Sequence, residues 1–129
     1  RRFLGKFEYR VEVPDAMLGC TMQKMLLQPL VENSIKHGFA QMKSGGCIQV
    51  RGWQENGACV FEVRDNGSGL SSDELARLVQ GLKSAELGAE DRIGLFNVHQ
   101  RVRLERGPGY GITEIESVAG DYMRVVLKV

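Results

Sequence analysis

Four polar side chains lie within six consecutive positions near the end of an apolar segment that reads LLQPLVENSIKHG, residues 26–38. They are Glu32, Asn33, Lys36 and His37. On a helix, with about 100° per residue, they form one arc opposite an apolar half, with Asn33 and His37 at its edges. The arc is either the solvated face of an amphipathic helix or a binding face. As a binding face it would suit a metal nucleotide, because an amide oxygen is a neutral ligand for a hard cation and a lysine neutralises phosphate.

A second candidate is the stretch VRDNGSGL, residues 63–70. Asp65 ends an apolar run and is followed by Gly67 and Gly69. A carboxylate accepts a hydrogen bond from an exocyclic amine. Adenine offers that amine at its N6 position, where guanine has an acceptor, and the two glycines would let the backbone approach the base. The alternative is an ordinary glycine turn, since Asp, Asn and Gly are common turn residues.

A third candidate is RIGLFNVHQRV, residues 92–102, in which Gly94 stands at the start of a helical pattern. The unpaired backbone N–H groups and the dipole at a helix N-terminus bind phosphate. A single glycine before a helix is equally typical of a hinge. His99, beside Gln100 and Arg101, is expected to lie on the helix surface.

Composition restricts the class of protein. The 129 residues fit one domain, residues 1–129, and the hydrophobic content of 43% and charged content of 26% are typical of a globular chain. A net charge of +1 gives no reason to expect nucleic acid or an anionic membrane as the partner. No apolar run is long enough to cross a membrane. Because the chain opens with Arg1 rather than Met, we expect it to be a piece of a longer protein.

The periodicity predicts the elements that must position these residues. Strands are expected at 7–13, 47–54, 58–64, 110–118 and 122–129, and helices at 22–38, from Ser71, and at 93–106. Strands that follow one another rather than alternate with helices favour an α+β two-layer sandwich: a mixed, mostly antiparallel sheet covered by helices on one face.

Local signals refine these expectations. Pro29 should kink or restart the first helix, and Gly38 suits a left-handed cap. Ser71 and Glu74 have the spacing of a capping box. Residues 81–91 lack periodicity and are expected to be mobile. In the last helix we expect four apolar side chains to face inward, namely Leu95, Val98, Val102 and Leu104.

Other site chemistries find little support. Cys20, Cys47 and Cys59 are widely spaced, so a zinc site formed with His37 or His99 lacks the usual close ligand pairs. The chain contains no G-x-x-x-x-G-K-[ST], which excludes a P-loop. No G-x-G-x-x-G follows a predicted strand, which disfavours a Rossmann site.

Taken together, the three stretches resemble the N, G1 and G2 boxes of the GHKL superfamily of ATP-binding domains, which includes DNA gyrase, MutL and the histidine kinases. The stretches LLQPLVENSIKHG and RIGLFNVHQRV are similar in sequence to the corresponding motifs of sensor histidine kinases of the LytS/YesM type. The resemblance covers nearly the whole chain. It implies the Bergerat variant of the α/β sandwich, which binds ATP with Mg²⁺.

The resemblance also implies roles for individual residues. Asn33 would be the magnesium ligand, Lys36 would contact phosphate, and His37 would lie beside the phosphates or ribose. Asp65 would read adenine, with Gly67 and Gly69 shaping its pocket. Gly94 would present backbone amides to the phosphates, Leu95 would pack at the base of a lid, and residues 81–91 would be that lid.

Two departures from the family pattern concern the same site. Arg92 replaces a glycine that the family usually carries before Gly94, where it either rigidifies the lid or contacts phosphate. Gly120-Asp121 replaces a Gly-Thr pair, which puts a carboxylate near the phosphates if its side chain faces them. We therefore expect this domain to bind ATP more weakly than its relatives.

The leading functional expectation is the catalytic domain of a sensor histidine kinase, with no certain catalytic residue in this segment. Its acceptor histidine would lie upstream on a dimerisation domain, so that the intact protein is a homodimer. Its second partner would be a response-regulator receiver domain. The resemblance implies a cytoplasmic part of a membrane-anchored bacterial protein. The alternatives are an ATP-driven clamp, which the proline at position 29 disfavours because such clamps carry a general-base glutamate there, and a noncatalytic nucleotide switch or serine kinase.

Overall fold

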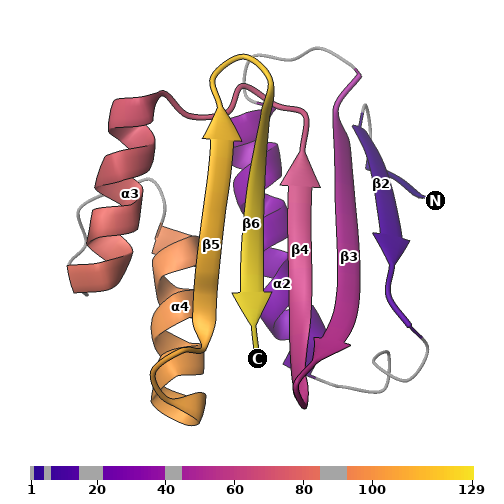
Figure 1. Ribbon diagram of the computed structural model, residues 1–129. Helices are drawn as coiled ribbons and strands as arrows, with labels where there is room; N and C mark the ends of the chain where they lie inside the picture. The colour runs from indigo at the N-terminus through magenta and orange to yellow at the C-terminus, as the bar shows by residue number, and fades with distance from the viewer. Residues whose placement is uncertain (1, 5–6, 15–21, 40–44, 85–92) are drawn as a thin grey trace.

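A computed structural model describes residues 2–4, 7–14, 22–39, 45–84 and 93–129 (Figure 1). Six strands and four helical segments occur in these ranges. The strands are β1 (Arg2–Leu4), β2 (Phe7–Glu12), β3 (Cys47–Glu55), β4 (Ala58–Asp65), β5 (Gly111–Val118) and β6 (Tyr122–Lys128). The helical segments are α2 (Met22–Asn33), the π-helix η1 (Ser34–Gly38), α3 (Ser72–Ser84) and α4 (Ile93–Arg106).

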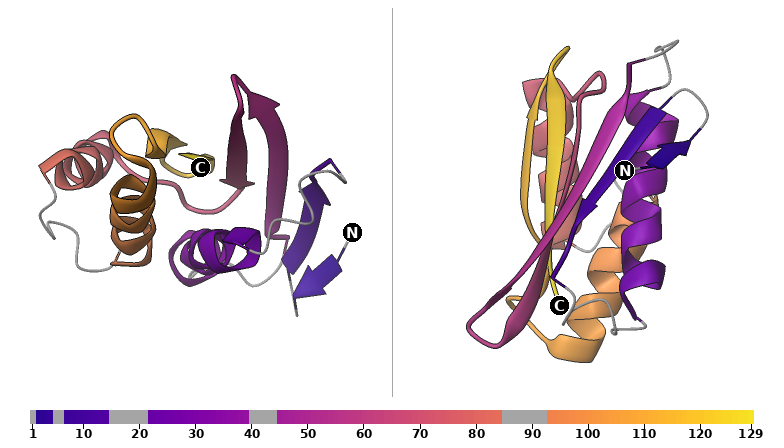
Figure 2. Two further views of the ribbon diagram at one scale, coloured as in Figure 1. Left: turned by 90° about the horizontal axis from the view of Figure 1, so that it is seen from below. Right: turned by 90° about the vertical axis from the view of Figure 1, so that its right-hand side faces the viewer.

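The six strands form one mixed sheet in the order β1-β2-β3-β4-β6-β5. Only the β2–β3 pair is parallel; the other four pairs are antiparallel. Asn56 and Gly57 have φ angles of 49° and 82°, so the predicted Asn-Gly turn joins β3 to β4. Helices α2 and α4 cover one face of the sheet, and α3 lies beside β5 (Figures 1 and 2). The predicted two-layer α+β architecture is confirmed.

The hydrophobic core lies between the sheet and the helices. Alternation along β4 directs Val63 and Asp65 to the helix side, where Val63 pairs with Val50 of β3 and Val125 of β6. The largest fully buried side chains are Leu30, Ile48, Leu95, Leu127, Val50 and Val102. Asp65 thus continues a row of otherwise apolar inward-facing positions, which makes it an exceptional place for a carboxylate.

The helix-free face of the sheet carries charged side chains instead. Arg124 of β6 donates from Nε to Glu62 of β4 at 2.6 Å and reaches Glu114 of β5 from Nη1 at 3.0 Å. These hydrogen bonds, the one to Glu62 first, raise the pKa of the Arg124 guanidinium above its ordinary value. Arg64 lies over the Tyr122 ring, 4.4 Å from its centroid. This network covers one face with polar groups and leaves the opposite face to the core.

The first helix runs through Pro29 without ending there, and its hydrogen-bond register changes later, at Ser34. Phe39 donates its backbone N–H to the Ser34 carbonyl at 3.0 Å, which is the i→i+5 bond of a π-helix. Gly38 is the last residue of the π-helix and the capping residue is Phe39, with φ −104°, so the left-handed cap predicted at Gly38 was wrong. Single π turns of this kind are frequent at functional sites.

Two further expectations were wrong. Helix α3 extends to Ser84, so residues 81–84 belong to a helix rather than to a mobile segment, and Leu82 is buried in the core. The remainder of the predicted lid, residues 85–91, lies outside the described residues. Leu104 is 86% exposed because it lies about 180° around α4 from Leu95, opposite the inward face.

The capping box predicted at the start of α3 is confirmed. Glu74 accepts from the Ser71 backbone N–H at 3.0 Å, and Ser71 Oγ accepts from the Glu74 N–H at 3.2 Å.

Candidate functional site

Asp65 is the centre of the candidate site. It is the last residue of β4, flanked across the sheet by Ile48 and Met123, and its side chain is only 3% exposed. Hydrogen bonds from Ser34 and Gly67 hold its carboxylate. Ser34 Oγ–H donates to Oδ2 at 2.7 Å, and the Gly67 backbone N–H donates to Oδ1 at 2.8 Å. A buried carboxylate needs such donors, because an unsatisfied charge away from water is costly.

Asn33 lies at the same end of the helix–sheet interface. It is 8% exposed, and its Nδ2 approaches the sulfur of Met123 at 4.0 Å. Met123 is the cross-strand neighbour of Asp65, and Ser34, the next residue along the helix, is bonded to Asp65. The structure therefore brings the predicted metal ligand and the predicted adenine reader into one neighbourhood.

The other polar residues of the first helix face different ways. Glu32 is exposed and accepts from Gln28 at 3.0 Å. Lys36 is exposed and His37 is half-buried. The predicted arc is thus divided, because Asn33 turns towards the sheet while Glu32 and Lys36 face outward. A contact between Lys36 and phosphate stays a prediction.

The loop between Asp65 and α3 is fixed from three sides. Asn66 accepts from the Cys47 backbone N–H at 2.7 Å and donates to the Gly45 carbonyl at 3.1 Å, which ties the loop to the start of β3. Ser68 donates to the His37 carbonyl at 3.4 Å. On the far side, the Leu70 N–H donates to Ser117 Oγ at 2.7 Å. A loop held in this way presents Asp65 without further ordering.

Gly69 has a structural reason to be glycine. Its φ is +64°, and a Cβ there would lie 2.3 Å from the Val118 carbonyl oxygen and 2.8 Å from that of Tyr122. The backbone at Gly69 therefore approaches the backbone of the β5–β6 hairpin closely. The same hairpin donates the Gly120 N–H to the Ser68 carbonyl at 2.6 Å. A contact between Gly69 and an adenine base stays a prediction.

Helix α4 supplies the residues of the third stretch. The helix begins at Ile93, and Gly94, in its first turn, is exposed and faces Pro29 of α2, so a Cβ there would lie 3.6 Å from the Pro29 Cβ. Leu95 is fully buried in the core. Arg92 lies outside the described residues. The predicted helix start is confirmed, and a contact between Gly94 and phosphate remains a prediction.

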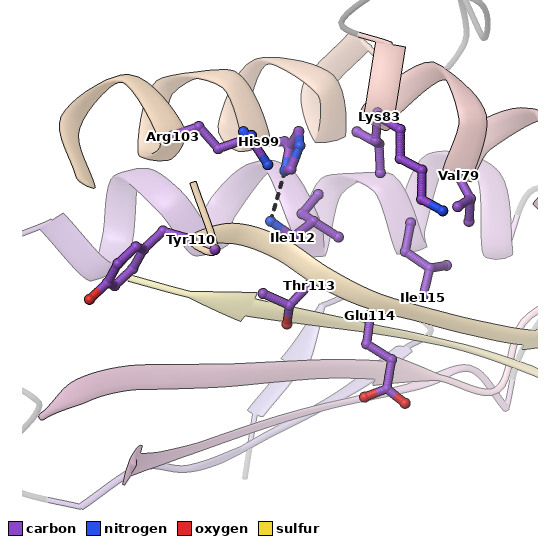
Figure 3. Close-up of a pocket in the computed structure, with 11 residues that line it drawn as sticks. Val79, Lys83, His99, Arg103, Tyr110, Ile112, Thr113, Glu114 and Ile115 are labelled. Carbon is purple, nitrogen blue, oxygen red and sulfur yellow. Dashed lines mark hydrogen bonds between the residues drawn. The ribbon is translucent and has the colours of Figure 1, made fainter. Parts of the chain in front are cut away.

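His99 was expected on the helix surface, and that expectation was wrong. The residue is 4% exposed, and its Nδ1 accepts from the Ile112 backbone N–H at 2.9 Å (Figure 3). Burial lowers its pKa, the nearby Arg103 guanidinium lowers it further, and a hydrogen bond with the Leu82 backbone raises it in part. A neutral ring that accepts at Nδ1 and reaches Leu82 links α4 to both β5 and α3.

His99 also lines a cavity of about 320 Å³ between α3, α4 and the edge strand β5 (Figure 3). Lys83, Arg103 and Tyr110 are among the residues that line it. Asn33 and Asp65 do not line it, so this cavity is separate from the candidate nucleotide site.

The lowered pKa of His99 predicts a pH-dependent stability. Above the ordinary value of 6.5 the ring is neutral in both the folded and unfolded chain, and its contribution is complete. As the pH falls below 6.5, the unfolded chain gains a proton before the folded one, so the free energy of unfolding falls by at most about 1.4 kcal/mol per pH unit. Urea unfolding at about pH 7.5 and about pH 5.5 measures this difference.

The matched variant for that prediction is His99→Asn, whose Oδ1 stands at the position of Nδ1 and can accept from the Ile112 N–H but does not titrate. The wild-type chain should lose more stability than this variant between the two pH values, while His37 and the carboxylates contribute equally to both. Equal losses would show that His99 is not the titrating group.

Metal-binding clusters are absent from the part of the chain that the structure describes: no group of three or more His, Cys, Asp or Glu side chains could hold an ion. Cys47 and Cys59 are free, half-buried thiols. No helix among the described residues is long and apolar enough to cross a membrane.

Residues 23–129 match the family model described as "Histidine kinase-, DNA gyrase B-, and HSP90-like ATPase". The chain is 33% identical over 98 residues to the sensor histidine kinase/phosphatase LytS of Staphylococcus aureus, covering 75% of this chain and 17% of that protein. It is 27% identical over 111 residues to the sensor histidine kinase YesM of Bacillus subtilis, covering 86% of this chain and 18% of that protein.

Among solved structures, the fold is similar to the histidine kinase domain of the blue-light activated histidine kinase from Erythrobacter litoralis. The TM-score is 0.61 at 17% identity, over 98% of this chain and 55% of that one. At this level of identity the likeness concerns the fold alone. In length, the matched part of the chain corresponds to less than a fifth of the LytS and YesM proteins.

Proposed function

This chain belongs to the histidine kinase-, DNA gyrase B- and HSP90-like ATPase family and is similar to its LytS and YesM members, and on that premise we propose that it is the ATP-binding catalytic domain of a sensor histidine kinase. In this proposal the γ-phosphoryl group of ATP passes to a histidine on a separate dimerisation domain. The observation that carries the proposal is the buried Asp65 carboxylate, held by Ser34 and Gly67 next to Asn33.

Asp65 is proposed to accept a hydrogen bond from the 6-amino group of adenine. Its two oxygens accept hydrogen bonds from Ser34 and Gly67, and a carboxylate oxygen can accept more than one hydrogen bond. Its flanking residues Ile48 and Met123 are apolar, which suits the ring of a base.

Asn33 is proposed to hold Mg²⁺ through its side-chain oxygen. Its burial next to Ser34 and Met123 supports a fixed ligand rather than a surface amide. The cation would neutralise phosphate charge, which is the main requirement of phosphoryl transfer. Lys36 and His37 follow on the same helical segment and are proposed to lie beside the phosphates, with Gly94 offering backbone N–H groups from the start of α4.

The proposed partners follow from the kinase relatives. They are a dimerisation domain with the acceptor histidine, contributed by a second copy of the protein, and a response-regulator receiver domain. His37 is proposed to lie at the phosphates and His99 is buried against β5, so neither suits the role of acceptor.

An ATP-driven clamp is disfavoured by the residues around Asn33. Proline occupies position 29, against Gly94, and the nearest carboxylate on the helix, Glu32, is exposed and bonded to Gln28. Neither can activate water beside a nucleotide held by Asn33.

Incubation of the intact protein with ATP labelled at the γ-phosphate tests the proposal. An acid-labile phosphohistidine that is lost in an Asn33→Ala variant is the expected result. Release of free phosphate without labelled protein would instead support a clamp. If neither product forms, the result would support a noncatalytic switch.

Asp121 gives a prediction about affinity. It is exposed in the β5–β6 turn, next to Gly120, whose N–H is bonded to the loop of Asp65 through Ser68. A carboxylate here repels phosphate weakly through water, so Asp121→Thr should tighten ATP–Mg²⁺ binding about threefold from a micromolar starting value. Calorimetric titration measures this change.

The control for that prediction is Glu55→Gln, which removes an exposed charge at the far end of β3 from Asp65. It should leave the affinity unchanged. Submicromolar binding by the unmodified chain, or equal gains in both variants, would contradict the idea that Asp121 weakens the site.

A further inference from the structure

The cavity between α3, α4 and β5 has apolar walls (Figure 3). Val79 and Leu82 line it from α3. Ile112 and Ile115 line it from β5, with their side chains directed towards the helices. Its volume of about 320 Å³ lies at the lower end of the range for small-molecule sites, which is about 300–1,000 Å³. These walls suit the apolar body of a small molecule.

Two cations, Lys83 of α3 and Arg103 of α4, also line the cavity. Both side chains lie on the side of their helices that faces β5 (Figure 3). Among the residues that the structure describes, neither forms an ion pair with a carboxylate. Both are exposed, so the cavity opens to solvent beside them. Two such cations at an apolar cavity attract a ligand that carries negative charge.

Glu114 also lines the cavity but does not cancel this positive charge. Its carboxylate points away from the helices (Figure 3) and accepts from Arg124 Nη1 at 3.0 Å on the helix-free face of the sheet. His99 adds no free polar group, because Nδ1 accepts from the Ile112 N–H and the ring also bonds the Leu82 backbone. Lys83 and Arg103 are therefore the charged groups to which a ligand responds.

Gly111 holds the α4 wall of the cavity close to β5. Its φ is +97°, and a Cβ there would lie 2.7 Å from His99 Nδ1 and 3.2 Å from Arg103 Cγ. The helix can approach the strand this closely only because position 111 has no side chain. The stem of Arg103 is thus packed against the strand, which limits the ordering that a ligand must impose.

We infer that this cavity is a binding site for a small organic anion, a carboxylate on an aromatic or aliphatic body. The body lies against Leu82, Ile112 and Ile115, and the carboxylate is attracted by Lys83 and Arg103. An inorganic anion would leave the apolar walls in contact with water. Because Asn33 and Asp65 do not line the cavity, the inference does not rest on the proposed function.

Three probes separate the two halves of this inference. Naphthoate carries an aromatic body and a carboxylate, naphthalenemethanol carries the same body without charge, and acetate carries the charge without the body. Each is titrated into the isotope-labelled chain and followed by NMR at the backbone amide of Ile112, which lines the cavity. Naphthoate should bind with a Kd of about 1 mM, and each of the other two at least about tenfold more weakly.

The double variant Lys83→Gln/Arg103→Gln tests the source of the charge. It should weaken naphthoate binding about tenfold and change naphthalenemethanol binding less than about twofold, because the apolar walls remain. The matched control is Arg77→Gln/Arg101→Gln, which removes two exposed cations from the same two helices. Arg77 lies about 240° around α3 from Lys83, and Arg101 about 200° around α4 from Arg103, so the control should leave naphthoate binding unchanged.

Equal affinities for naphthoate and naphthalenemethanol would overturn the inference, since the cavity would then select an apolar body and not an anion. Equal losses in the two double variants would also overturn it, because they would reflect net charge alone. The same holds if Ile112 shows no shift up to about 10 mM naphthoate, or if the Gly67 and Gly69 amides shift in its place. Should a thermal melt show that a variant is unfolded, the three probes on the wild-type chain decide by themselves.

Discussion

Asp65→Asn is expected to weaken ATP–Mg²⁺ binding by about 100-fold or more, the largest effect on binding that we predict. The amide nitrogen adds donors where the carboxylate offered only acceptors. Ser34 and Gly67 both donate to this side chain, so the amide must turn its nitrogen towards one of them or give up the contact to adenine. A 100-fold loss corresponds to about 2.7 kcal/mol, which is within the range for losing a hydrogen bond to a charged group and leaving a donor unpaired.

Calorimetric titration measures that loss, and Asp73→Asn is its control. Asp73 is an exposed carboxylate in the first turn of α3, so its replacement should leave affinity within about twofold. Thermal unfolding of both variants shows whether the fold survives. Binding by a folded Asp65→Asn protein within threefold of wild type would contradict the assignment of the adenine site.

Gly69→Ala is expected to have the largest effect on stability, about 3 kcal/mol or more. Two terms add. The residue has a φ of +64°, and the new Cβ would lie 2.3 Å from the Val118 carbonyl oxygen. That oxygen belongs to the backbone of the β5–β6 hairpin, so relief requires the hairpin or the loop to move. The free energy of unfolding in urea measures the loss.

Gly57→Ala is the matched control for this steric term. Gly57 also has a positive φ, +82°, but no atom lies within 4 Å of the position of its Cβ. It should lose only about 1 kcal/mol, the cost of the backbone conformation. Equal losses in the two variants would mean that the contact with the hairpin does not matter.

Much of the fold could be predicted because local signals agreed with the tertiary structure. Alternation located the strands of the two hairpins, and the Asn56-Gly57 turn and the Ser71–Glu74 capping box appear as expected. The predicted helix Ile93–Arg106 has the same bounds in the structure. The three-residue strand β1 was missed, since so short a segment shows no period.

The errors have particular physical causes. His99 follows Leu95 by four positions, the spacing of the inward face, but its polarity and polar neighbours favoured the surface; the Ile112 N–H and the Leu82 backbone satisfy the buried ring instead. Leu104 was expected inside because it is apolar, although its angle places it outside. Tertiary partners decide whether a polar side chain can be buried, and these partners are distant in sequence.

The sequence pointed to individual residues of the candidate site but not to the hydrogen bond that joins its helix to its strand. The resemblance to the family motifs singled out Asn33 and Asp65, whose roles stay predictions, whereas the Ser34–Asp65 bond joins residues 31 positions apart in the chain. Nothing in the local pattern indicates that contact. The π turn that begins at Ser34 was also missed, since a π turn has no clear sequence signature and the glycine at position 38 suggested an ordinary cap.

The most direct test of the nucleotide site is a crystal structure of the chain with Mg²⁺ and a nonhydrolysable ATP analogue. The account predicts the adenine 6-amino group within hydrogen-bonding distance of the Asp65 carboxylate, and the metal at about 2.1 Å from the Asn33 side-chain oxygen. A nucleotide bound elsewhere, such as in the cavity beside His99, or with its base turned away from Asp65, would contradict it.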